Sequence, residues 1–202
     1  MTKPLLPAVD AAGRLREAAF ALLLRDRQPV TVAAVSHATG LSEASARRSV
    51  TALANAGWLD LDTDGRVAGA AGLSLIKGAH RLTLEGAAFR TWCAYDALGI
   101  PAALVSDGSL ETACGHCGRS LSVAFRSGMP TRSGPEVVWL AEGSADLRAS
   151  FCTPTVLLCS DEHGRAWAET QGGNGDLLSL KQASRRGGAD WAGCADAAKR
   201  LA

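Results

Sequence analysis

The stretch that decides the fold of the first third of the chain is LSEASARRSVTALANAGWLDLDTDGRVAG, residues 41–69. Its first half has apolar residues at helical spacing, with Ser42 suited to cap the helix and Gly57 suited to end it. Its second half contains Asp64 followed by Gly65, a pair typical of a two-residue hairpin turn. The stretch therefore predicts a helix followed by a β-hairpin.

Two more helices are predicted before this stretch. Residues 10–27 place leucines and alanines on one helical face and arginines mostly on the other, and Pro29 ends the segment. The next helix begins after Thr31, a suitable N-cap, and ends at Gly40. Three helices followed by a hairpin form the outline of a winged helix-turn-helix.

Charge argues against DNA binding by this module. The helix that would enter the major groove carries only Arg47 and Arg48, beside Glu43, and the whole chain has a formal net charge of +1. The hairpin offers three aspartates against one arginine, whereas a surface that follows phosphates needs more lysine and arginine. We therefore favour a winged-helix module used as a scaffold, and a transcriptional regulator that senses metal or oxidants through cysteines stays open as the alternative.

The rest of the chain reads mostly as strands. Residues 72–84 predict two short strands around Gly78, and residues 85–105 predict a helix that is broken near Pro101. Further strands are predicted at LETAC, SLSVAF, EVVWLAE and TPTVLLCS, a helical turn at 145–151, and helices at 162–170 and 188–201. The expected fold is α+β: a three-helix winged-helix-like module over 1–70, then a mainly antiparallel sheet domain with flanking helices over 71–202.

Composition indicates a cytoplasmic protein with reduced thiols. The 202 residues are 47% hydrophobic and 20% charged, ordinary values for a globular chain with a sizeable core. The N-terminus lacks the apolar stretch of a signal segment, and no apolar run approaches the ~18 residues of a membrane span. In the cytoplasm, six cysteines favour metal binding or thiol chemistry over three disulfides.

Cys114 and Cys117 have the spacing of half a zinc site, which needs four ligands. None of the other cysteines lies two to four residues from another. The nearest pair, Cys152 and Cys159, would be about 23 Å apart on an extended strand. Two histidines lie near these cysteines, His116 and His163. They leave a Cys-Cys-His set open, but the missing second pair favours small buried thiols over a structural zinc.

A stronger chemical signal is the segment FRTWCAYDALGIP, residues 89–101. Cys93 and Asp96 are three residues apart on a predicted helix, so their side chains are expected to share a face. A carboxylate beside a thiol can take its proton and return it to another atom. Apolar neighbours, Trp92 among them, should raise the pKa of the carboxyl group toward a value suited to that work. Without further support, a buried cysteine and an aspartate on the helix surface would be the better interpretation.

These residues resemble the organomercurial (alkylmercury) lyase family. The likeness covers about residues 80–175 well and the N-terminal helices, where that family also has a winged-helix-like module, more loosely. It rests on five anchors in order: Trp92-Cys93-Ala94-x-Asp96 followed by Pro101-Ala102, Cys114 with Gly118, Leu121 with Val123, Ser150-Phe151-Cys152, and Trp167-Ala168.

The resemblance implies a catalytic trio of Cys93, Asp96 and Cys152. The implied reaction is protonolysis of a carbon–mercury bond to a hydrocarbon and Hg(II), with Asp96 carrying the proton from a thiol to carbon. The same three residues would hold Hg(II), a soft metal that prefers thiolates. No organic cofactor is implied. Cytosolic thiols or a mercuric reductase would remove the product.

The resemblance also sorts the remaining cysteines. Cys114 matches a structural cysteine of the family, Cys117 has no counterpart, and Cys159 replaces a small residue without a thiol. Thr153 follows Cys152 where some relatives have another cysteine. The role of Cys194 stays open. A paralogue that has lost activity and only binds metal is a second alternative, because an intact trio does not guarantee an open site.

Overall fold

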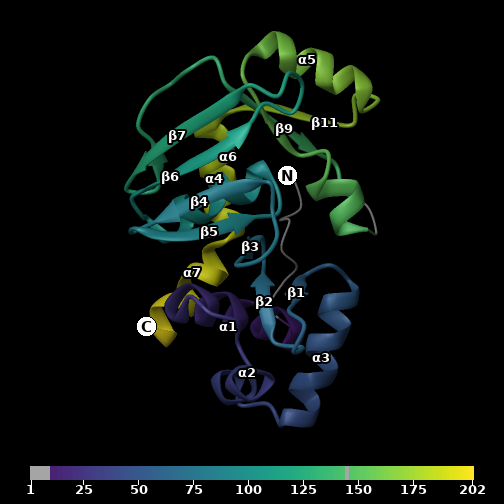
Figure 1. Ribbon diagram of the computed structural model, residues 1–202, viewed down its shortest axis with the longest axis vertical. Coiled ribbons are helices and arrows are strands. Elements are labelled where there is room, and N and C mark those ends of the chain that lie inside the picture. Colours follow the sequence, from purple (N-terminus) through teal and green to yellow (C-terminus); the bar gives the residue numbers. More distant parts are fainter. Residues whose placement is uncertain (1–9, 144–145) are drawn as a thin grey trace.

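The computed structural model describes residues 10–143 and 146–202; residues 1–9, where no signal segment is expected, and Ala145 of the predicted helical turn lie outside the described residues. Figure 1 shows an elongated molecule with the N-terminal helices at one end and the sheets above them. The elements of the N-terminal module are α1 (Ala11–Asp26), α2 (Val32–Thr39), α3 (Glu43–Asn55), β1 (Leu59–Leu61) and β2 (Val67–Ala70). They confirm the predicted three helices and hairpin.

The predicted caps of this module are present. The side chains of Thr31 and Ser42 accept hydrogen bonds from the backbone of Ala34 and Ser45, in the first turns of α2 and α3. Gly40 ends α2 with φ of 70°, a left-handed conformation that glycine adopts without a steric penalty. Local sequence chemistry therefore sets these helix limits.

A single antiparallel sheet begins in the N-terminal module and continues through the second half of the fold. Its strand order is β1-β2-β3-β5-β4-β6-β7-β8. The added strands are β3 (Leu73–Ser74), β4 (His80–Leu84), β5 (Ala87–Thr91), β6 (Gly108–Ala113), β7 (Ser120–Arg126) and β8 (Met129–Pro130). The boundary proposed at residue 70 falls between β2 and β3, which pair directly.

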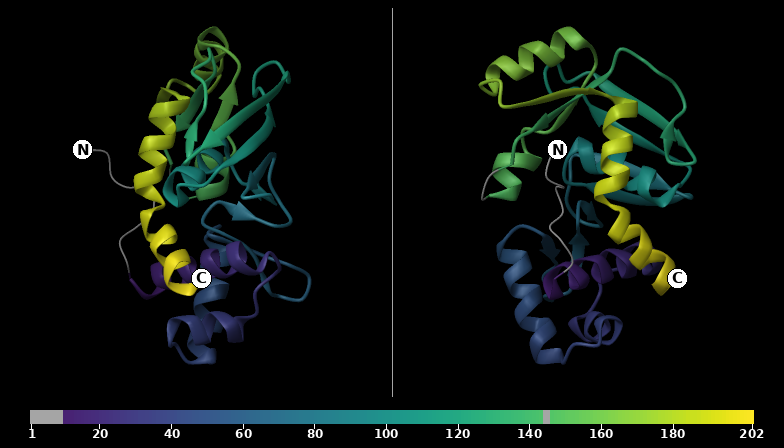
Figure 2. Two further views of the ribbon diagram at one scale, coloured as in Figure 1. Left: turned by 90° about the vertical axis from the view of Figure 1, so that its left-hand side faces the viewer. Right: turned by 180° about the vertical axis from the view of Figure 1, so that it is seen from behind.

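Three helices pack together beside this sheet, one from the middle of the chain and two from its end, and the last of them contacts the N-terminal module. They are α4 (Ala94–Leu104), α6 (Leu180–Asp190) and α7 (Ala192–Leu201). Figure 2 shows α6 and α7 running along one side of the molecule, and α7 packs against α1. The Trp191 indole, between α6 and α7, donates a 2.6 Å hydrogen bond to the carbonyl of Ala71. Both ends of the chain therefore meet around one core.

A smaller layer completes the fold. It holds a three-stranded sheet of order β10-β9-β11, a helix, and a turn of π-helix that leads into Cys152. Its elements are β9 (Val137–Ala141), η1 (Leu147–Cys152), β10 (Val156–Leu158), α5 (Asp161–Thr170) and β11 (Gly175–Ser179). Among the helices formed by the described residues, none is both long and apolar enough to cross a membrane.

Three expectations about this half were wrong. Residues 87–91 form a strand instead of the start of a helix, and α4 continues through Pro101. Every residue of α4 from Ala94 to Pro101 is buried, so packing offsets the backbone hydrogen bond that proline removes. The last helical region is longer than predicted and is divided at Trp191 into α6 and α7. Its first part, α6, was not predicted because it contains Gly187. That glycine packs against Gly99 of α4, where an added Cβ would lie 2.5 Å from a backbone carbon.

Candidate active site

Cys93 and Asp96 meet at the start of α4. Cys93 follows β5 through Trp92 and is the N-cap, with an extended backbone at φ −140°. Its backbone N–H donates a 2.8 Å hydrogen bond to Oδ2 of Asp96, the third residue of the helix. The predicted pair is therefore together, but through N-terminal capping and not through a shared face of a continuous helix.

Gly72 makes room for the Asp96 carboxyl group. Its φ is +92°, and an added Cβ would lie 2.6 Å from Cγ of Asp96. The Gly72 carbonyl also accepts a hydrogen bond from the Trp92 N–H. A side chain at position 72 would therefore displace Asp96, which makes this glycine part of the site. No sequence motif had pointed to it.

Cys152 reaches the same place from the opposite direction. It ends η1, is 6% exposed, and its thiol lies near enough to the fully buried thiol of Cys93 to raise the pKa of that group. The N–H of Ala94 donates to the carbonyl of Thr155, which holds the start of α4 against the segment that follows Cys152. The structure thus brings together all three residues predicted for the reaction.

The environment sets different protonation states for the thiol and the carboxyl group. Burial raises the pKa of the Cys93 thiol well above its usual value, and the hydrogen bond with Cys152 and the charge of Asp96 add to the rise. Burial also raises the pKa of Asp96, to about 6, although hydrogen bonds from Cys93 and the charge of Arg148 oppose the shift. Near neutral pH the site therefore pairs a neutral thiol with a carboxylate that can accept its proton.

Aromatic side chains enclose the carboxyl group and the second thiol. A small cavity of about 10 Å³ is lined by Trp58, Ala71, Gly72, Trp92, Asp96, Leu147, Phe151, Cys152 and Trp191. Trp58 belongs to the N-terminal module, so the module supplies part of the wall. Such a wall keeps water out, and its side chains must move before an organic group can enter, which extends the packing role expected for Trp92 alone.

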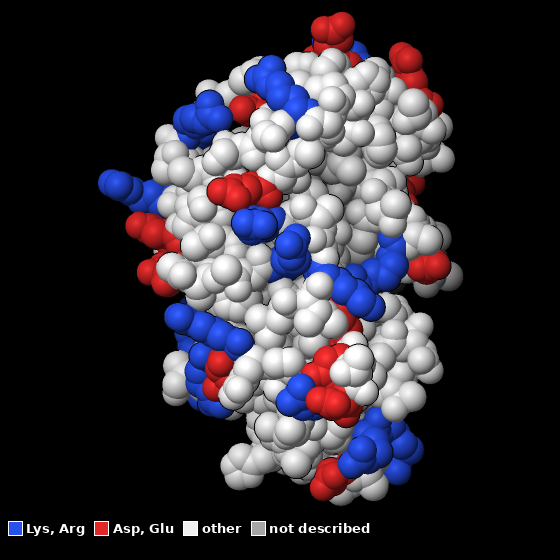
Figure 3. Space-filling model, viewed as in Figure 1, with Lys and Arg blue, Asp and Glu red and all other residues white. Residues whose placement is uncertain are grey.

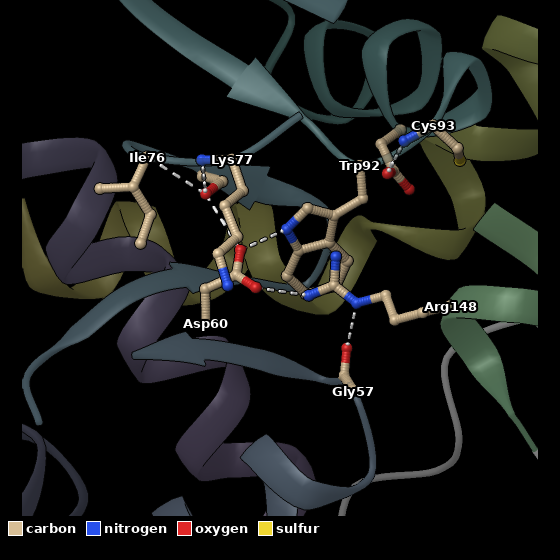
Figure 4. A network of polar contacts seen from close by, with 9 residues as sticks. Gly57, Asp60, Ile76, Lys77, Trp92, Cys93 and Arg148 are labelled. Atoms are coloured by element: carbon tan, nitrogen blue, oxygen red, sulfur yellow. Dashed lines mark hydrogen bonds and ion pairs between the residues drawn. The ribbon is translucent and has the colours of Figure 1, made fainter. Parts of the chain in front are cut away.

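A buried polar network holds the wall in place (Figure 4). Asp60 of β1 accepts a 2.7 Å hydrogen bond from the indole of Trp92 and pairs with Arg148 at 3.0 Å. Arg148 also donates to the carbonyl of Gly57 at 2.7 Å. Its guanidinium carbon lies 3.2 Å from the centre of the Trp92 ring, in cation–π geometry. No sequence pattern pointed to Asp60 or Arg148, because their partners are far away in the chain.

A second cluster of thiols lies outside this pocket. The ligand atoms of Cys114, Cys117, Cys159 and His163 all lie within 4.8 Å of one another. The expectation that the Cys114–Cys117 pair lacks its other half was wrong, because the end of β10 turns toward this pair after Leu158. Cys194 is separate from both groups; it is buried in α7, which raises its pKa to about 12.

Comparisons with known proteins agree with this geometry. The alkylmercury lyase family model matches residues 73–193, and the IclR helix-turn-helix model matches residues 18–63. An alkylmercury lyase of Pseudomonas putida is 31% identical over 161 residues, covering 76% of this chain and 74% of the relative. One of Streptomyces lividans is 25% identical over 151 residues, covering 73% and 68%.

A solved structure extends the likeness to almost the whole chain. It is the mercury-bound form of MerB2, with a TM-score of 0.80 and 26% sequence identity, covering 95% of this chain and 93% of that one. The match includes the N-terminal helices as well as the sheets. The chain belongs to the alkylmercury lyase family.

Proposed function

We propose that this protein is an organomercurial lyase, which cleaves a carbon–mercury bond by protonolysis and releases a hydrocarbon and Hg(II). The observation that carries the proposal is that the buried residues Cys93, Cys152 and Asp96 interact with one another, with Asp96 at a pKa of about 6. Two soft ligands beside a group that can move a proton supply what this reaction needs.

Substrate capture uses the two thiols. The organomercurial enters bound to an external thiolate, and attack by one enzyme sulfur displaces that thiolate, which leaves as a thiol with the proton of the attacking group. The second enzyme sulfur then binds mercury and passes its proton to the Asp96 carboxylate. Without this acceptor, the high pKa of the buried Cys93 would keep the thiol protonated.

Cleavage uses the proton stored on Asp96. Two thiolates donate electron density to mercury and weaken its bond to carbon. The electron pair of that bond goes to carbon, which takes the proton of Asp96, so a C–H bond forms as the C–Hg bond breaks. Hg(II) stays between Cys93 and Cys152 in linear coordination, which requires the sulfurs to come within about 5 Å, twice a soft metal–sulfur bond of about 2.4 Å.

We infer that the reaction needs no organic cofactor, since proton and ligands come from the chain itself. External thiols, or the thiols of a mercuric reductase, would take Hg(II) from the two cysteines by ligand exchange. This requirement fits the reducing cytoplasm, where we place the protein.

The test is benzene release from phenylmercury in the presence of excess thiol, followed by headspace gas chromatography. The wild-type protein should release one benzene for each substrate consumed, and Cys93→Ser should release none. Cys194→Ser is the matched control, because this thiol is buried elsewhere, and it should keep the activity. Stoichiometric mercury binding without benzene would instead identify a paralogue that only binds metal.

A further inference from the structure

The cluster of Cys114, Cys117, Cys159 and His163 has the dimensions of a tetrahedral metal site. The sulfurs of Cys117 and Cys159 are 3.8 Å apart, and Nδ1 of His163 lies 3.1 Å from the Cys159 sulfur and 3.8 Å from the Cys114 sulfur. With Zn–S near 2.3 Å and Zn–N near 2.0 Å, tetrahedral angles require about 3.8 Å between two sulfurs and about 3.5 Å between sulfur and nitrogen. One ion at the centre could therefore reach all four atoms with small adjustments.

The first two ligands come from a tight turn between β6 and β7. Cys114 donates its backbone N–H to the carbonyl of Arg119 at 2.8 Å, and Gly118 donates back to the carbonyl of Cys114 at 2.9 Å. Gly118 has φ of +72°, which favours glycine, and its conformation closes the turn. The turn thus presents two sulfurs to the same point.

The other two ligands come from the junction of β10 and α5. Ser160 caps α5 and accepts a hydrogen bond from the backbone N–H of His163, so the imidazole returns toward Cys159. Cys159 and His163 are four residues apart, within the usual spacing of zinc ligand pairs. The two halves are held together by a 2.9 Å hydrogen bond from the N–H of Gly115 to the carbonyl of Leu157.

We propose that Cys114, Cys117, Cys159 and His163 bind one Zn(II) ion as a structural site, separate from the two cysteines proposed to bind mercury. Three sulfurs and one imidazole suit a borderline-soft divalent ion and not calcium or magnesium, which take oxygen ligands. Four protein ligands leave no open position, which is typical of structural and not catalytic zinc. A disulfide is a poorer account, because it would use two of three convergent thiols and leave the histidine unexplained.

The site would join the two sheets next to the proposed active site. Cys114 and Cys117 follow a strand of the large sheet, whereas Cys159 follows a strand of the small one. The segment from Cys152 leads directly into β10, so an ion at the end of that strand would limit the movement of the second mercury-binding thiol. The zinc ion would therefore stabilise the position of Cys152 and would not itself take part in the cleavage of the carbon–mercury bond.

The direct test is the zinc content of the full chain, purified without a chelating column from cells grown with zinc. Mass spectrometry of the metal should find close to one zinc per chain in the wild type. Cys117→Ser should lower this value at least about tenfold, and it should not disturb packing because Cys117 is exposed. The matched controls are Cys194→Ser, a buried thiol in α7, and His116→Gln, an imidazole beside the cluster; both should keep the ion.

A second measurement protects the result against variants that fold poorly. Zinc is removed from the wild type with a chelator and a mercurial-free thiol buffer, and Co(II) is added. Visible bands of tetrahedral Co(II) with thiolate ligands should appear in the wild type and weaken in His163→Gln. Thermal unfolding should also occur at a lower temperature after zinc removal and recover when Zn(II) returns.

Two results would overturn the proposal. One is a wild-type protein without zinc that also shows no tetrahedral Co(II) bands. The other is a cluster that takes up Hg(II) but not Zn(II), which would make it a mercury trap. Both are distinct from failure of the lyase assignment, because zinc content and Co(II) spectra do not depend on benzene release.

Discussion

Oδ1 of Asp60 and a terminal nitrogen of Arg148 lie 3.0 Å apart, and this ion pair joins the wing of the N-terminal module to the turn that ends at Cys152. The same carboxylate accepts a hydrogen bond from Trp92, the residue before Cys93. One buried aspartate therefore positions the segments that carry both thiols. The module acts as a scaffold for the site, which is the role that its weak positive charge favours.

Asp60→Ala should lower the free energy of unfolding by about 3 to 5 kcal/mol, because it leaves the Arg148 guanidinium and the Trp92 N–H without their buried partner. Urea denaturation followed by circular dichroism measures the change. Asp64→Ala is the matched control: this aspartate pairs with Arg66 on the surface, and its loss should cost less than about 1 kcal/mol. Equal losses of unfolding free energy for the two variants would mean that the buried network stabilises the fold no more than a surface ion pair does.

Asp96→Asn should keep mercury binding and lose cleavage. The amide has nearly the same volume and can still accept the hydrogen bond from the N–H of Cys93, but it cannot carry a proton from sulfur to carbon. Loss of a general acid–base group lowers a rate by about 10² to 10⁴-fold. Benzene release from phenylmercury and Hg(II) stoichiometry should be measured on the same preparations.

The two thiols provide the contrasting variants for that experiment. Cys93→Ser and Cys152→Ser should lose both capture and cleavage, because a hydroxyl group is a poor ligand for a soft metal. Cleavage by Asp96→Asn at a rate near that of the wild type would contradict the proposed mechanism. The carboxyl group would then serve only to cap α4.

Cleavage should become slower as the pH falls through about 6. Burial raises the pKa of Asp96 to about 6, and below that pH the carboxyl group is already protonated in the free enzyme. It can then no longer accept the proton of a thiol during capture. The pH profile of kcat/KM for phenylmercury measures this, and a profile that stays flat between pH 5 and 7 would exclude Asp96 as the proton acceptor.

The N-terminal module should not bind DNA with sequence selectivity. In α3, Arg47 is paired with Glu43 at 2.6 Å, and Arg48 donates to Ser45. Lys and Arg side chains alternate with Asp and Glu over the visible face of this module (Figure 3). Fluorescence anisotropy at physiological salt should therefore show only weak, non-selective affinity, about 10⁻⁴ to 10⁻⁶ M. Sequence-selective binding with a dissociation constant below about 10⁻⁶ M would favour a transcriptional regulator.

The N-terminal module could be predicted from the sequence because its signals are local. Ser42, Thr31 and Gly40 determine where helices begin and end through hydrogen bonds to neighbouring backbone. In the large sheet, β4, β6 and β7 were also predicted, whereas β5 was predicted to be the start of a helix. By contrast, α6 contains two adjacent glycines and was not predicted. A capping box of Ser179 and Gln182 starts it, and Gly187 packs against Gly99 of α4.

The active site was predictable only in part. The spacing of Cys93 and Asp96 paired those two residues, and the resemblance added Cys152. The network of Asp60 and Arg148 joins residues 88 positions apart and leaves no pattern in the sequence. The cluster around Cys114 shows the same limit. In the sequence, the cysteine nearest to Cys159 is Cys152. In the structure, the thiols beside Cys159 are those of Cys114 and Cys117, which follow a strand of the other sheet. Spacing alone cannot show such contacts.

His80 should make the protein less stable as the pH falls. It is 5% exposed, its Nδ1 lies 2.7 Å from the hydroxyl group of Thr112, and burial lowers its pKa to about 4. Between pH 6.5 and 4 the unfolded chain binds a proton at this histidine that the folded chain does not, so the free energy of unfolding falls with pH in this window. At 1.36 kcal/mol per pKa unit, the full loss is about 3 kcal/mol.

His80→Asn should remove this slope, because the amide keeps a polar group near Nδ1 and does not titrate. Urea unfolding at pH 4, 5, 6 and 7 gives the slope for each protein. His37→Asn on the exposed face of α2 is the matched control and should keep the slope of the wild type. If wild type and His80→Asn lose stability in parallel, the histidine is protonated in the folded protein at the same pH as in the unfolded chain, and its burial has no effect on acid stability.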